Sequence, residues 1–218
     1  PNLLNHAKRL LSLKKGDRLL DLYCGYGLFA FGIGKEASEV IGAEWEGPSV
    51  ESAKASAKFL KRFHYKFISG KIDESFVERV LPKPIENEII LLDPPRKGCL
   101  PGVIETLAKR NPKRVLHIFC GTDEIPLALQ EWKSGGYFPK EILPLDLFPG
   151  TAHIETMILL DKGYSGVRKL AEEYPYSLYD IEYREANKKK FVVIRFTSTK
   201  TKFFSLPYNK IKFCNDYS

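Results

Sequence analysis

Short apolar runs alternate with longer amphipathic segments along the first three quarters of the chain. Five of these runs lack regular polar positions and predict buried parallel strands, at Arg18–Cys24, Glu39–Glu44, Tyr65–Ser69, Glu88–Asp93 and Arg114–Cys120. Apolar residues recur with helical period in five other segments and predict helices, at Asn2–Leu13, Pro48–Phe63, Ile72–Leu81, Leu100–Arg110 and Thr122–Lys133. Strands that alternate with helices in this order predict an open, doubly wound α/β sheet.

Two more apolar runs follow, at Lys140–Phe148 and His153–Leu160, and only four residues separate them. A parallel crossover needs about a dozen residues, so this pair must be antiparallel. A parallel sheet with a terminal antiparallel hairpin is typical of methyltransferases that use S-adenosylmethionine (SAM). We therefore expect residues 1–161 to form one Rossmann-like, SAM-dependent methyltransferase domain.

Residues 162–218 show a different pattern and predict a small C-terminal extension. Its expected parts are a linker at Gly163–Gly166, a short helix at Val167–Glu173, and a hairpin of strands Phe191–Phe196 and Lys202–Leu206. The division between domain and extension is therefore expected near residue 162.

The distribution of charge supports a division of the chain near residue 162. The chain has 218 residues, and its 44% hydrophobic content excludes a disordered chain. No apolar run approaches the roughly 18 residues of a membrane span, so we expect no membrane partner. The net charge of +7 is uneven, because residues 1–161 carry 22 basic and 21 acidic side chains, whereas residues 162–218 carry 12 and 6.

The extension combines basic and aromatic residues. It holds 12 of the 25 tyrosines and phenylalanines, together with Lys188, Lys189 and Lys190. Such a mixture fits an RNA surface on which bases stack and phosphates are neutralised. It also fits a small β core whose lysines are solvated. The two interpretations are compatible if one face of the hairpin is buried and the other is basic, and both stay open.

The four cysteines form no C-x-x-C pair, and the four histidines are scattered, so we expect no metal site. Free cysteines and the lack of an apolar signal segment favour a reducing cytoplasm. The chain begins with Pro1 and its one methionine is Met157. We therefore expect it to be part of a longer protein.

A candidate cofactor site follows the first predicted strand. Asp21, Tyr23, Gly25 and Gly27 lie in a turn whose glycines let the backbone pass close to a ligand. Glu44 ends the second strand, where a carboxylate can accept both ribose hydroxyls of an adenosine. A third glycine in dinucleotide spacing is replaced by Ala30, which weakens but does not exclude a dinucleotide. The acid at the end of the second strand, together with the antiparallel hairpin, favours SAM over NAD. Cys24 is expected to be a small packing residue.

A candidate reaction site follows the fourth predicted strand. Asp93 is held by Pro94 and Pro95, which rigidify the loop and direct the carboxylate toward the pocket. Arg96 and Lys97 come next; they could contact phosphate or be solvated loop charges, and both interpretations stay open.

Cys120 and Glu155 complete the candidate chemistry. Cys120 precedes a predicted helix whose N-cap would be Thr122, so the helix dipole should favour the thiolate. Glu155 interrupts an apolar run, which indicates either a paired structural acid or a general base with a raised pKa. His117 lies inside a strand, and the sequence indicates no partner for it.

These motifs together resemble the RNA 5-methyluridine methyltransferases, which methylate uracil C5 in tRNA and rRNA. The resemblance covers about residues 1–161 and rests on Asp21–Gly27, on DPPRKG at Asp93–Gly98, and on FPGTAHIET at Phe148–Thr156. It implies SAM as cofactor and rRNA or tRNA as partner.

The resemblance also implies residue roles. Cys120 would be the nucleophile that attacks uracil C6, and Glu155 the base that removes the C5 proton. Asp93 would position the uracil and the cofactor, and Glu44 would bind ribose. An acid found after the third strand in the family is Lys71 here, and Asp73 is near enough to replace it.

The chain departs from the family around the nucleophile, where Phe119-Cys120-Gly121-Thr122 stands in place of Ser-Cys-Asn-Pro. A family glutamine that contacts the cofactor, the small β-barrel domain and the iron–sulfur cysteines would lie upstream of Pro1. Two other interpretations therefore remain: an RNA N-methyltransferase that holds an exocyclic amine with Asp93–Arg96, and a non-catalytic, RNA-binding pseudo-methyltransferase.

Overall fold

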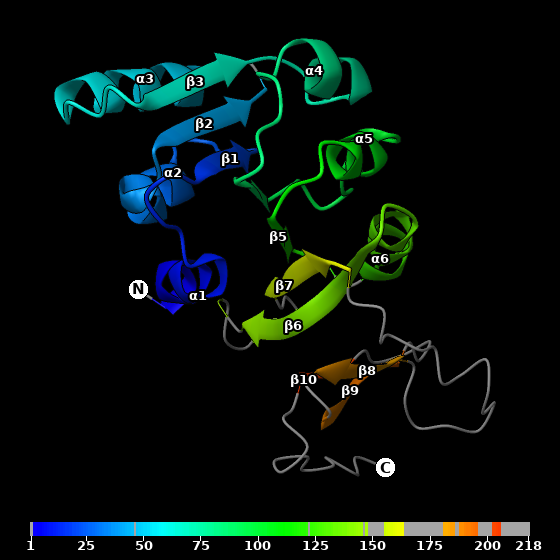
Figure 1. Cartoon of the computed structure of the whole chain (residues 1–218). Helices are drawn as coiled ribbons and strands as arrows, with labels where there is room; N and C mark the ends of the chain where they lie inside the picture. Colours follow the sequence, from blue (N-terminus) through cyan, green and yellow to red (C-terminus); the bar gives the residue numbers. More distant parts are fainter. Residues whose placement is uncertain are drawn as a thin grey trace.

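The computed structural model describes residues 2–45, 47–121, 123–145, 147 and 155–163, together with the backbones of residues 181–185, 188–195 and 202–205. A large sheet flanked by helices forms the first part of the chain (Figure 1). Its elements are α1 (Asn2–Leu11), β1 (Arg18–Leu22), α2 (Leu28–Ile33), η1 (Gly34–Glu36), β2 (Glu39–Glu44), α3 (Pro48–Phe59), β3 (Tyr65–Ser69), α4 (Glu74–Arg79), β4 (Glu88–Leu92), α5 (Val103–Lys109), β5 (Arg114–Phe119), α6 (Ile125–Ser134), β6 (Tyr137–Leu145) and β7 (Glu155–Lys162).

The strand order of this sheet is β3-β2-β1-β4-β5-β7-β6. Strands β1 to β5 run parallel, whereas β7 is antiparallel to both β5 and β6. The order reverses between β1 and β4, which makes the crevice at their carboxyl ends a ligand position of open α/β sheets. The predicted methyltransferase fold, with its parallel sheet and terminal antiparallel hairpin, is confirmed.

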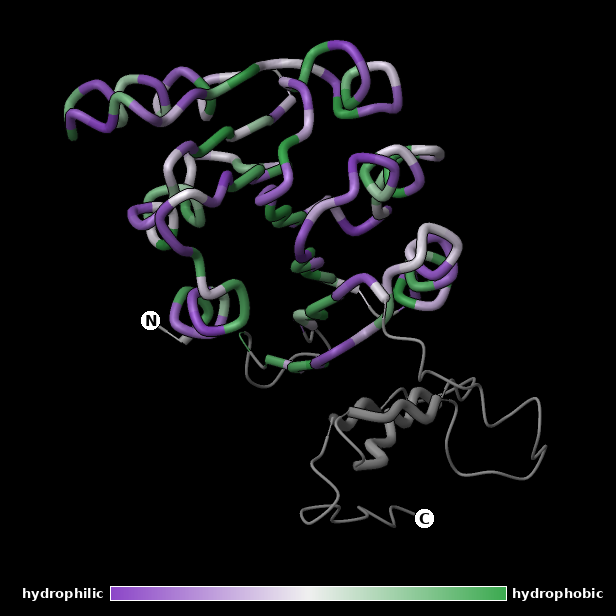
Figure 2. Tube along the Cα trace, in the orientation of Figure 1, coloured by the Kyte–Doolittle hydropathy of each residue, from purple (hydrophilic) through white to green (hydrophobic). Residues whose placement is uncertain are grey.

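Helices cover both faces of the sheet, because alternate strand residues point to opposite sides. Leu20, Leu22, Ile90 and Leu92 point toward α4, α5 and α6, whereas their neighbours Leu19, Ile89 and Leu91 point toward α1, α2 and α3. Figure 2 shows the hydrophobic colours concentrated along the central strands, with mixed colours on the helices. Two apolar layers therefore enclose the sheet and hold its carboxyl edge in place.

Several predicted boundaries were wrong. Helix α2 was missed, because Gly27, Gly32 and Gly34 obscure the helical period in six residues. A Cβ at Gly32 would come within 2.7 Å of the Leu4 side chain on α1, so this glycine lets the two helices lie close together. The terminal hairpin is shifted, with β6 beginning at Tyr137 and β7 ending at Lys162. Helix α6 begins at Ile125, three residues later than predicted.

A second sheet has three antiparallel strands, β8 (Ile181–Glu185), β9 (Lys188–Arg195) and β10 (Lys202–Ser205), in the order β10-β9-β8. The predicted pairing of the last two strands is confirmed. Strand β8 was not predicted, and Lys188–Lys190 begin β9 and pair with β8. The predicted helix Val167–Glu173 lies outside the described residues.

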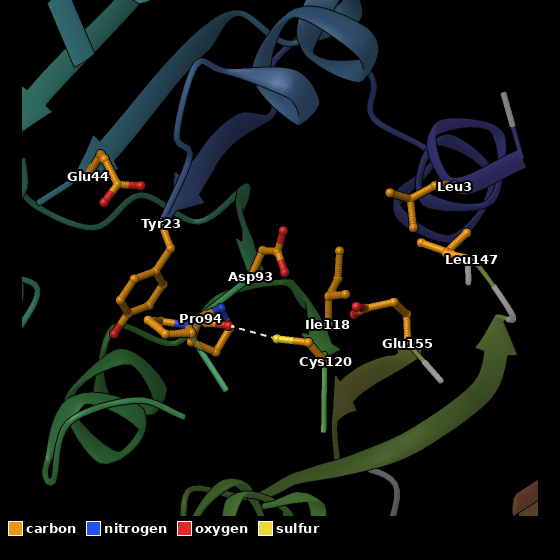
Figure 3. Close-up of a pocket in the computed structure, with 10 residues that line it drawn as sticks. Leu3, Tyr23, Glu44, Asp93, Pro94, Ile118, Cys120, Leu147 and Glu155 are labelled. Carbon is orange, nitrogen blue, oxygen red and sulfur yellow. Dashed lines mark hydrogen bonds between the residues drawn. The ribbon is translucent and has the colours of Figure 1, made fainter. Parts of the chain in front are cut away.

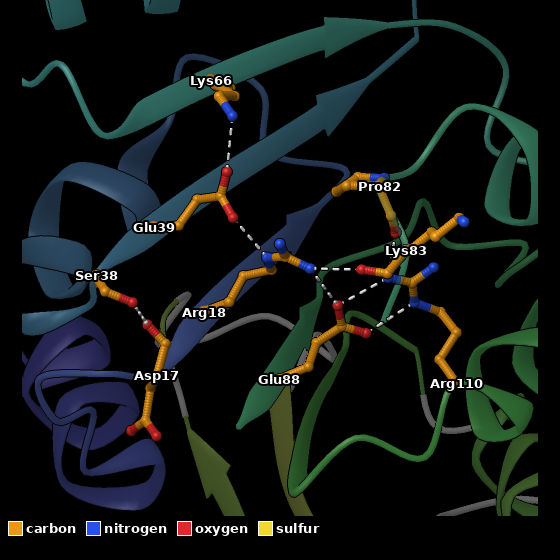
Figure 4. Close-up of polar contacts among 9 residues, drawn as sticks. All are labelled: Asp17, Arg18, Ser38, Glu39, Lys66, Pro82, Lys83, Glu88 and Arg110. Atoms are coloured by element: carbon orange, nitrogen blue, oxygen red, sulfur yellow. Dashed lines mark hydrogen bonds and ion pairs between the residues drawn. The ribbon is translucent and has the colours of Figure 1, made fainter. Parts of the chain in front are cut away.

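A polar network ties the amino ends of the strands together (Figure 4). The fully buried Glu88 carboxylate accepts two hydrogen bonds from Arg110, each at 2.7 Å. Arg18 lies 3.5 Å from Glu88 and donates to Glu39 at 2.7 Å, and Glu39 also accepts from Lys66. These contacts fix the amino edge of the sheet, opposite the edge that holds the candidate site.

Candidate functional site

A cavity of about 440 Å³ opens at the carboxyl edge of the large sheet (Figure 3). Residues that end β2 or follow β1, β4 and β5 meet there with the first residue of β7, and α1 and Leu147 close the far side. The lining residues are Leu3, Tyr23, Glu44, Asp93, Pro94, Pro95, Ile118, Cys120, Leu147 and Glu155. Five of the predicted site residues, from five different strand ends, are therefore brought together.

The turn after β1 needs its unusual backbone. Tyr23, Gly25 and Gly27 all have positive φ, at 64°, 52° and 85°. At Gly27 a Cβ would also lie 2.8 Å from the Phe31 ring, so glycine is required on both grounds. The turn thereby presents the Tyr23 side chain to the cavity. Burial, and then the nearby Cys99, raise the pKa of the Tyr23 hydroxyl, which stays protonated.

Glu44 braces this turn from the neighbouring strand. One of its carboxylate oxygens accepts from the Gly25 N–H at 2.8 Å, and the other accepts from its neighbour Trp45 at 2.6 Å. Each carboxylate oxygen can accept a further hydrogen bond. The Glu44 carboxylate therefore lies at the cavity wall, fixed in orientation, with acceptor capacity left for a ligand.

Asp21 and Asp73 do not line the cavity as the predicted cofactor contacts would. Asp21 is fully buried behind the turn, where its carboxylate accepts from the Ala30 N–H at 2.8 Å. Burial raises the pKa of Asp21 to about 7. Asp73 is the N-cap of α4 and accepts from the Phe76 N–H at 2.9 Å. The Asp21 carboxylate therefore supports the turn, and the Asp73 carboxylate caps the first turn of α4.

Asp93 lies at the centre of the cavity, immediately after β4. Its backbone N–H donates to Leu22 at 3.2 Å, which keeps the loop against the sheet. Burial raises the pKa of Asp93 to about 6, and the charges of Glu155 and Glu44 add to the effect. Arg96 and Lys97 are exposed on the following turn, and the Arg96 charge opposes the raised pKa of Glu155.

At the other end of the cavity, Cys120 follows β5 and Glu155 begins the neighbouring strand β7. Phe119 pairs with Thr156 across the antiparallel β5/β7 pair, so the residues just beyond this pair, Cys120 and Glu155, stand opposite one another. The Cys120 thiol donates to the Pro94 carbonyl at 3.5 Å (Figure 3). Burial raises the pKa of Glu155, as the sequence predicted for an acid within an apolar run.

The prediction that a helix dipole favours the Cys120 thiolate was wrong. Helix α6 begins at Ile125, five residues after Cys120, with Glu124 at its N-cap position. Burial, and then the charges of Glu155 and Asp93, raise the pKa of the Cys120 thiol. Thr122, the predicted N-cap, lies outside the described residues. These surroundings therefore favour the neutral thiol over the thiolate.

The structure also shows the surroundings of His117 and Cys24. His117 does have a partner, since its Nδ1 accepts from the Trp132 indole N–H at 3.1 Å, and burial lowers its pKa to about 3. Cys24 is a buried packing residue, as expected. The sequence missed Leu3 and Leu147 as lining residues, because nothing in their local pattern separates them from core leucines.

Some predictions fall on residues that are not described. The segment 148–154, which carries most of the FPGTAHIET motif, lies outside the described residues, as do the side chains of Lys188, Lys189 and Lys190. Within the described ranges, no group of three His, Cys, Asp or Glu side chains could hold a metal ion. No helix in that part of the chain has the length and apolar character to span a membrane.

A SAM-like ligand fits the chemistry of this cavity. Three carboxylates, Glu44, Asp93 and Glu155, line it together, which favours a ligand with a positive charge and disfavours the phosphates of a dinucleotide. Glu44 retains acceptor capacity for hydroxyl donors. The volume lies within the range of small-molecule sites.

No protein-family model matches the chain. Among curated proteins, one from Lactobacillus johnsonii named "Uncharacterized RNA methyltransferase" is 33% identical over 162 residues, covering 74% of this chain and 36% of that protein. One of the same name from Clostridium tetani is 31% identical over 167 residues, covering 77% and 36%. The chain thus spans about a third of the length of these relatives.

Solved structures show a similar fold at low identity. The Pyrococcus abyssi tRNA (uracil-54, C5)-methyltransferase, in complex with S-adenosyl-L-homocysteine, aligns with a TM-score of 0.60 and 23% identity, covering 73% of this chain and 37% of that one. An rRNA methylase from Streptococcus thermophilus aligns with a TM-score of 0.55 and 14% identity, covering 72% and 94%. Both likenesses show the fold.

Proposed function

We propose that this chain, which is similar to proteins named RNA methyltransferases over about three quarters of its length, contains in residues 1–161 the catalytic domain of a SAM-dependent enzyme that methylates uracil C5 in RNA. One observation carries the proposal: a thiol, Cys120, and a carboxylate, Glu155, stand opposite each other on one cavity wall with Asp93 beside them. Methylation of an exocyclic nitrogen would need no cysteine at this position.

Glu44 and the turn from Tyr23 to Gly27 would hold the adenosine part of SAM. The Glu44 carboxylate would accept from ribose hydroxyls while it keeps its hydrogen bond to the Gly25 N–H. When bound, SAM supplies a methyl group on a positively charged sulfur. Such a charge near Asp93, Glu155 and Cys120 would offset the carboxylates that raise the pKa of the thiol, and so favour the reactive thiolate.

The Cys120 thiolate would add to C6 of the uracil. A C6–S bond forms, and the electron pair of the C5=C6 double bond moves toward the C4 carbonyl oxygen, which makes C5 a carbon nucleophile. Asp93 would orient the uracil ring for this step from its position between the two ends of the cavity. The leucines Leu3 and Leu147 would keep water away from the reacting atoms.

Glu155 would then act as the general base. Once C5 carries the methyl group, the Glu155 carboxylate removes the C5 proton, the C5=C6 double bond returns, and the C6–S bond breaks to release Cys120. Burial favours the protonated form of Glu155, so the carboxylate is a stronger base than an exposed glutamate. This role needs the close opposition of Cys120 and Glu155.

The RNA itself, an rRNA or a tRNA, would reach the cavity past Arg96 and Lys97, which are exposed beside Asp93 and can contact phosphate. The extension at 162–218, with Lys188, Lys189 and Lys190, would add a second basic contact. These residues then bind the RNA backbone, while the cavity reads the base.

The proposal is tested with RNA that contains 5-fluorouridine. Fluorine at C5 cannot leave as a proton does, so the C6–S bond should persist and give a covalent protein–RNA complex on a denaturing gel. The complex should require SAM and disappear in the Cys120→Ala variant. Absence of the complex in the wild type, or its persistence in Cys120→Ala, overturns the proposal, and full methylation by Cys120→Ala would indicate N-methylation instead.

A further inference from the structure

Two phenylalanines at the end of α3 are almost fully exposed. Phe59 is the last residue of α3 and is 86% exposed, and Phe63, in the turn before β3, is 84% exposed. Leu60 between them is 50% exposed. Exposed apolar groups this large, gathered within five residues, mark interaction sites more often than isolated surface residues do.

The surroundings of these rings are basic. Between Glu51 and Asp73 the sequence has six basic residues and no acidic one, although residues 1–161 as a whole are nearly neutral. Two of the six are ion-paired, Lys54 with Glu51 and Lys66 with Glu39. Lys58, Lys61 and Arg62 flank the rings, and they form no ion pair with any residue that the structure describes. The surface therefore offers aromatic faces within a local field that attracts a polyanion.

This surface lies at the opposite edge of the sheet from the catalytic cavity. Helix α3 begins at Pro48, just after Glu44 of the cavity, and runs back along the sheet to Phe59 (Figure 1). Its 12 residues span roughly 18 Å. His64, which follows the rings, accepts a hydrogen bond from Val40 at the start of β2, and this places the turn at the amino edge.

We infer that Phe59 and Phe63, together with Lys58, Lys61 and Arg62, form a second RNA-binding surface that holds a single-stranded segment outside the catalytic cavity. Bases stack on the exposed rings, and the cations neutralise the phosphates between them. A single strand fits better than a duplex, because bases in a duplex do not expose their faces. The inference rests on the proposed function, since it takes RNA as the partner.

The decisive experiment measures the affinity of a labelled, 20-nucleotide single-stranded RNA by fluorescence anisotropy. The Phe59→Ala/Phe63→Ala variant should bind about fivefold or more weakly than the wild type, because stacking contributes at least this much for each base. Val80→Ala is the control: Val80 is also an exposed apolar residue, 48% exposed at the C-cap of α4, and its variant should bind RNA like the wild type.

A salt titration tests the charged part of the surface. Lys58→Gln/Lys61→Gln should reduce the slope of log affinity against log salt by about 1.4, since each phosphate contact on a single strand contributes about 0.7. Unchanged affinity in the phenylalanine variant overturns the inference. So does a wild-type dimer that this variant converts to a monomer without loss of RNA binding, because the surface would then be a protein interface.

The experiments can disprove the uracil-C5 reaction and the RNA-binding surface at the end of α3 independently of each other. If the 5-fluorouridine complex forms but the phenylalanine variant binds RNA normally, only the second surface is wrong. If no complex forms but RNA binding still depends on the two rings, only the uracil-C5 reaction is wrong.

Discussion

Cys120 and Glu155 stand directly opposite each other where β5 and β7 meet at the cavity, one residue past the Phe119–Thr156 pair. This opposition exists only because β7 is antiparallel to β5. In an antiparallel pair the carboxyl end of one strand adjoins the amino end of the other, so a residue that ends β5 meets a residue that begins β7. The hairpin of the fold thereby brings a nucleophile and a base together.

Glu155→Gln should stop the reaction after methyl transfer. The amide cannot accept the C5 proton, so a covalent complex should accumulate on ordinary uridine RNA, and tritium release from [5-³H]uridine should fall roughly 10²–10⁴-fold. Denaturing gels and the release assay measure the two effects. Glu131→Gln is a matched control, because burial also raises the pKa of Glu131 but its side chain lies on α6, outside the cavity. Normal tritium release from Glu155→Gln would exclude this base.

Much of this site could be predicted from the sequence, because strand ends carry it. Glu44 ends a parallel strand, Asp93 and Cys120 each follow one, and the carboxyl ends of such strands meet at one edge. The connection before the last strand is too short for a parallel crossover, so this strand must be antiparallel. Its first residues, with Glu155, therefore lie at the same edge of the sheet. The positions of these residues follow from the sheet, whereas their chemical roles belong to the proposed reaction.

The rest could not be predicted, because it depends on packing between distant segments. Leu3 lines the cavity from α1, a helix that packs against α2 and β5, elements distant from it in the sequence. The burial of Asp21 depends on the missed helix α2, whose Ala30 N–H it accepts. The raised pKa of Cys120 depends on burial and on the charges of Glu155 and Asp93, which come from two other strands of the sheet.

Asp21 should make the protein less stable as the pH rises. Burial raises the pKa of Asp21 to about 7, against about 4 in the unfolded chain, so between these values the folded protein holds a proton that the unfolded chain has released. Raising the pH through this window therefore lowers the free energy of unfolding. Asp21→Asn can still accept from the Ala30 N–H and should be more stable than the wild type at pH 8, by about 1 kcal/mol or more.

Urea titrations at pH 5 and pH 8 measure this effect. The difference between Asp21→Asn and the wild type should be small at pH 5 and clear at pH 8. Equal stability of the two proteins at pH 8, or a larger advantage at pH 5, would contradict a buried carboxyl with a raised pKa.

The buried Glu88 network should be essential for stability. Glu88→Gln leaves the buried Arg110 guanidinium without a counter-charge, although Arg110 keeps its hydrogen bond to the Pro82 carbonyl (Figure 4). Breaking such a pair costs about 3–5 kcal/mol, seen as a lower urea midpoint. Lys54→Gln, which breaks an exposed pair with Glu51, is the control and should leave the midpoint nearly unchanged. A midpoint for Glu88→Gln like that of the control would mean that water already screens the network.

Glu44 and Asp73 should differ in their effect on cofactor binding, although the sequence predicted both as contacts. Glu44→Gln keeps one acceptor for the Gly25 N–H but loses the charge, so the affinity for SAM and for S-adenosylhomocysteine should fall about tenfold or more in calorimetry. Asp73→Ser keeps a side-chain oxygen that can cap α4, and it removes only the carboxylate. Because Asp73 does not line the cavity, this variant should bind both compounds like the wild type. A tenfold loss in Asp73→Ser with an unchanged melting temperature would show that Asp73 reaches the cofactor, and the ribose-binding role would then be shared between the two acids.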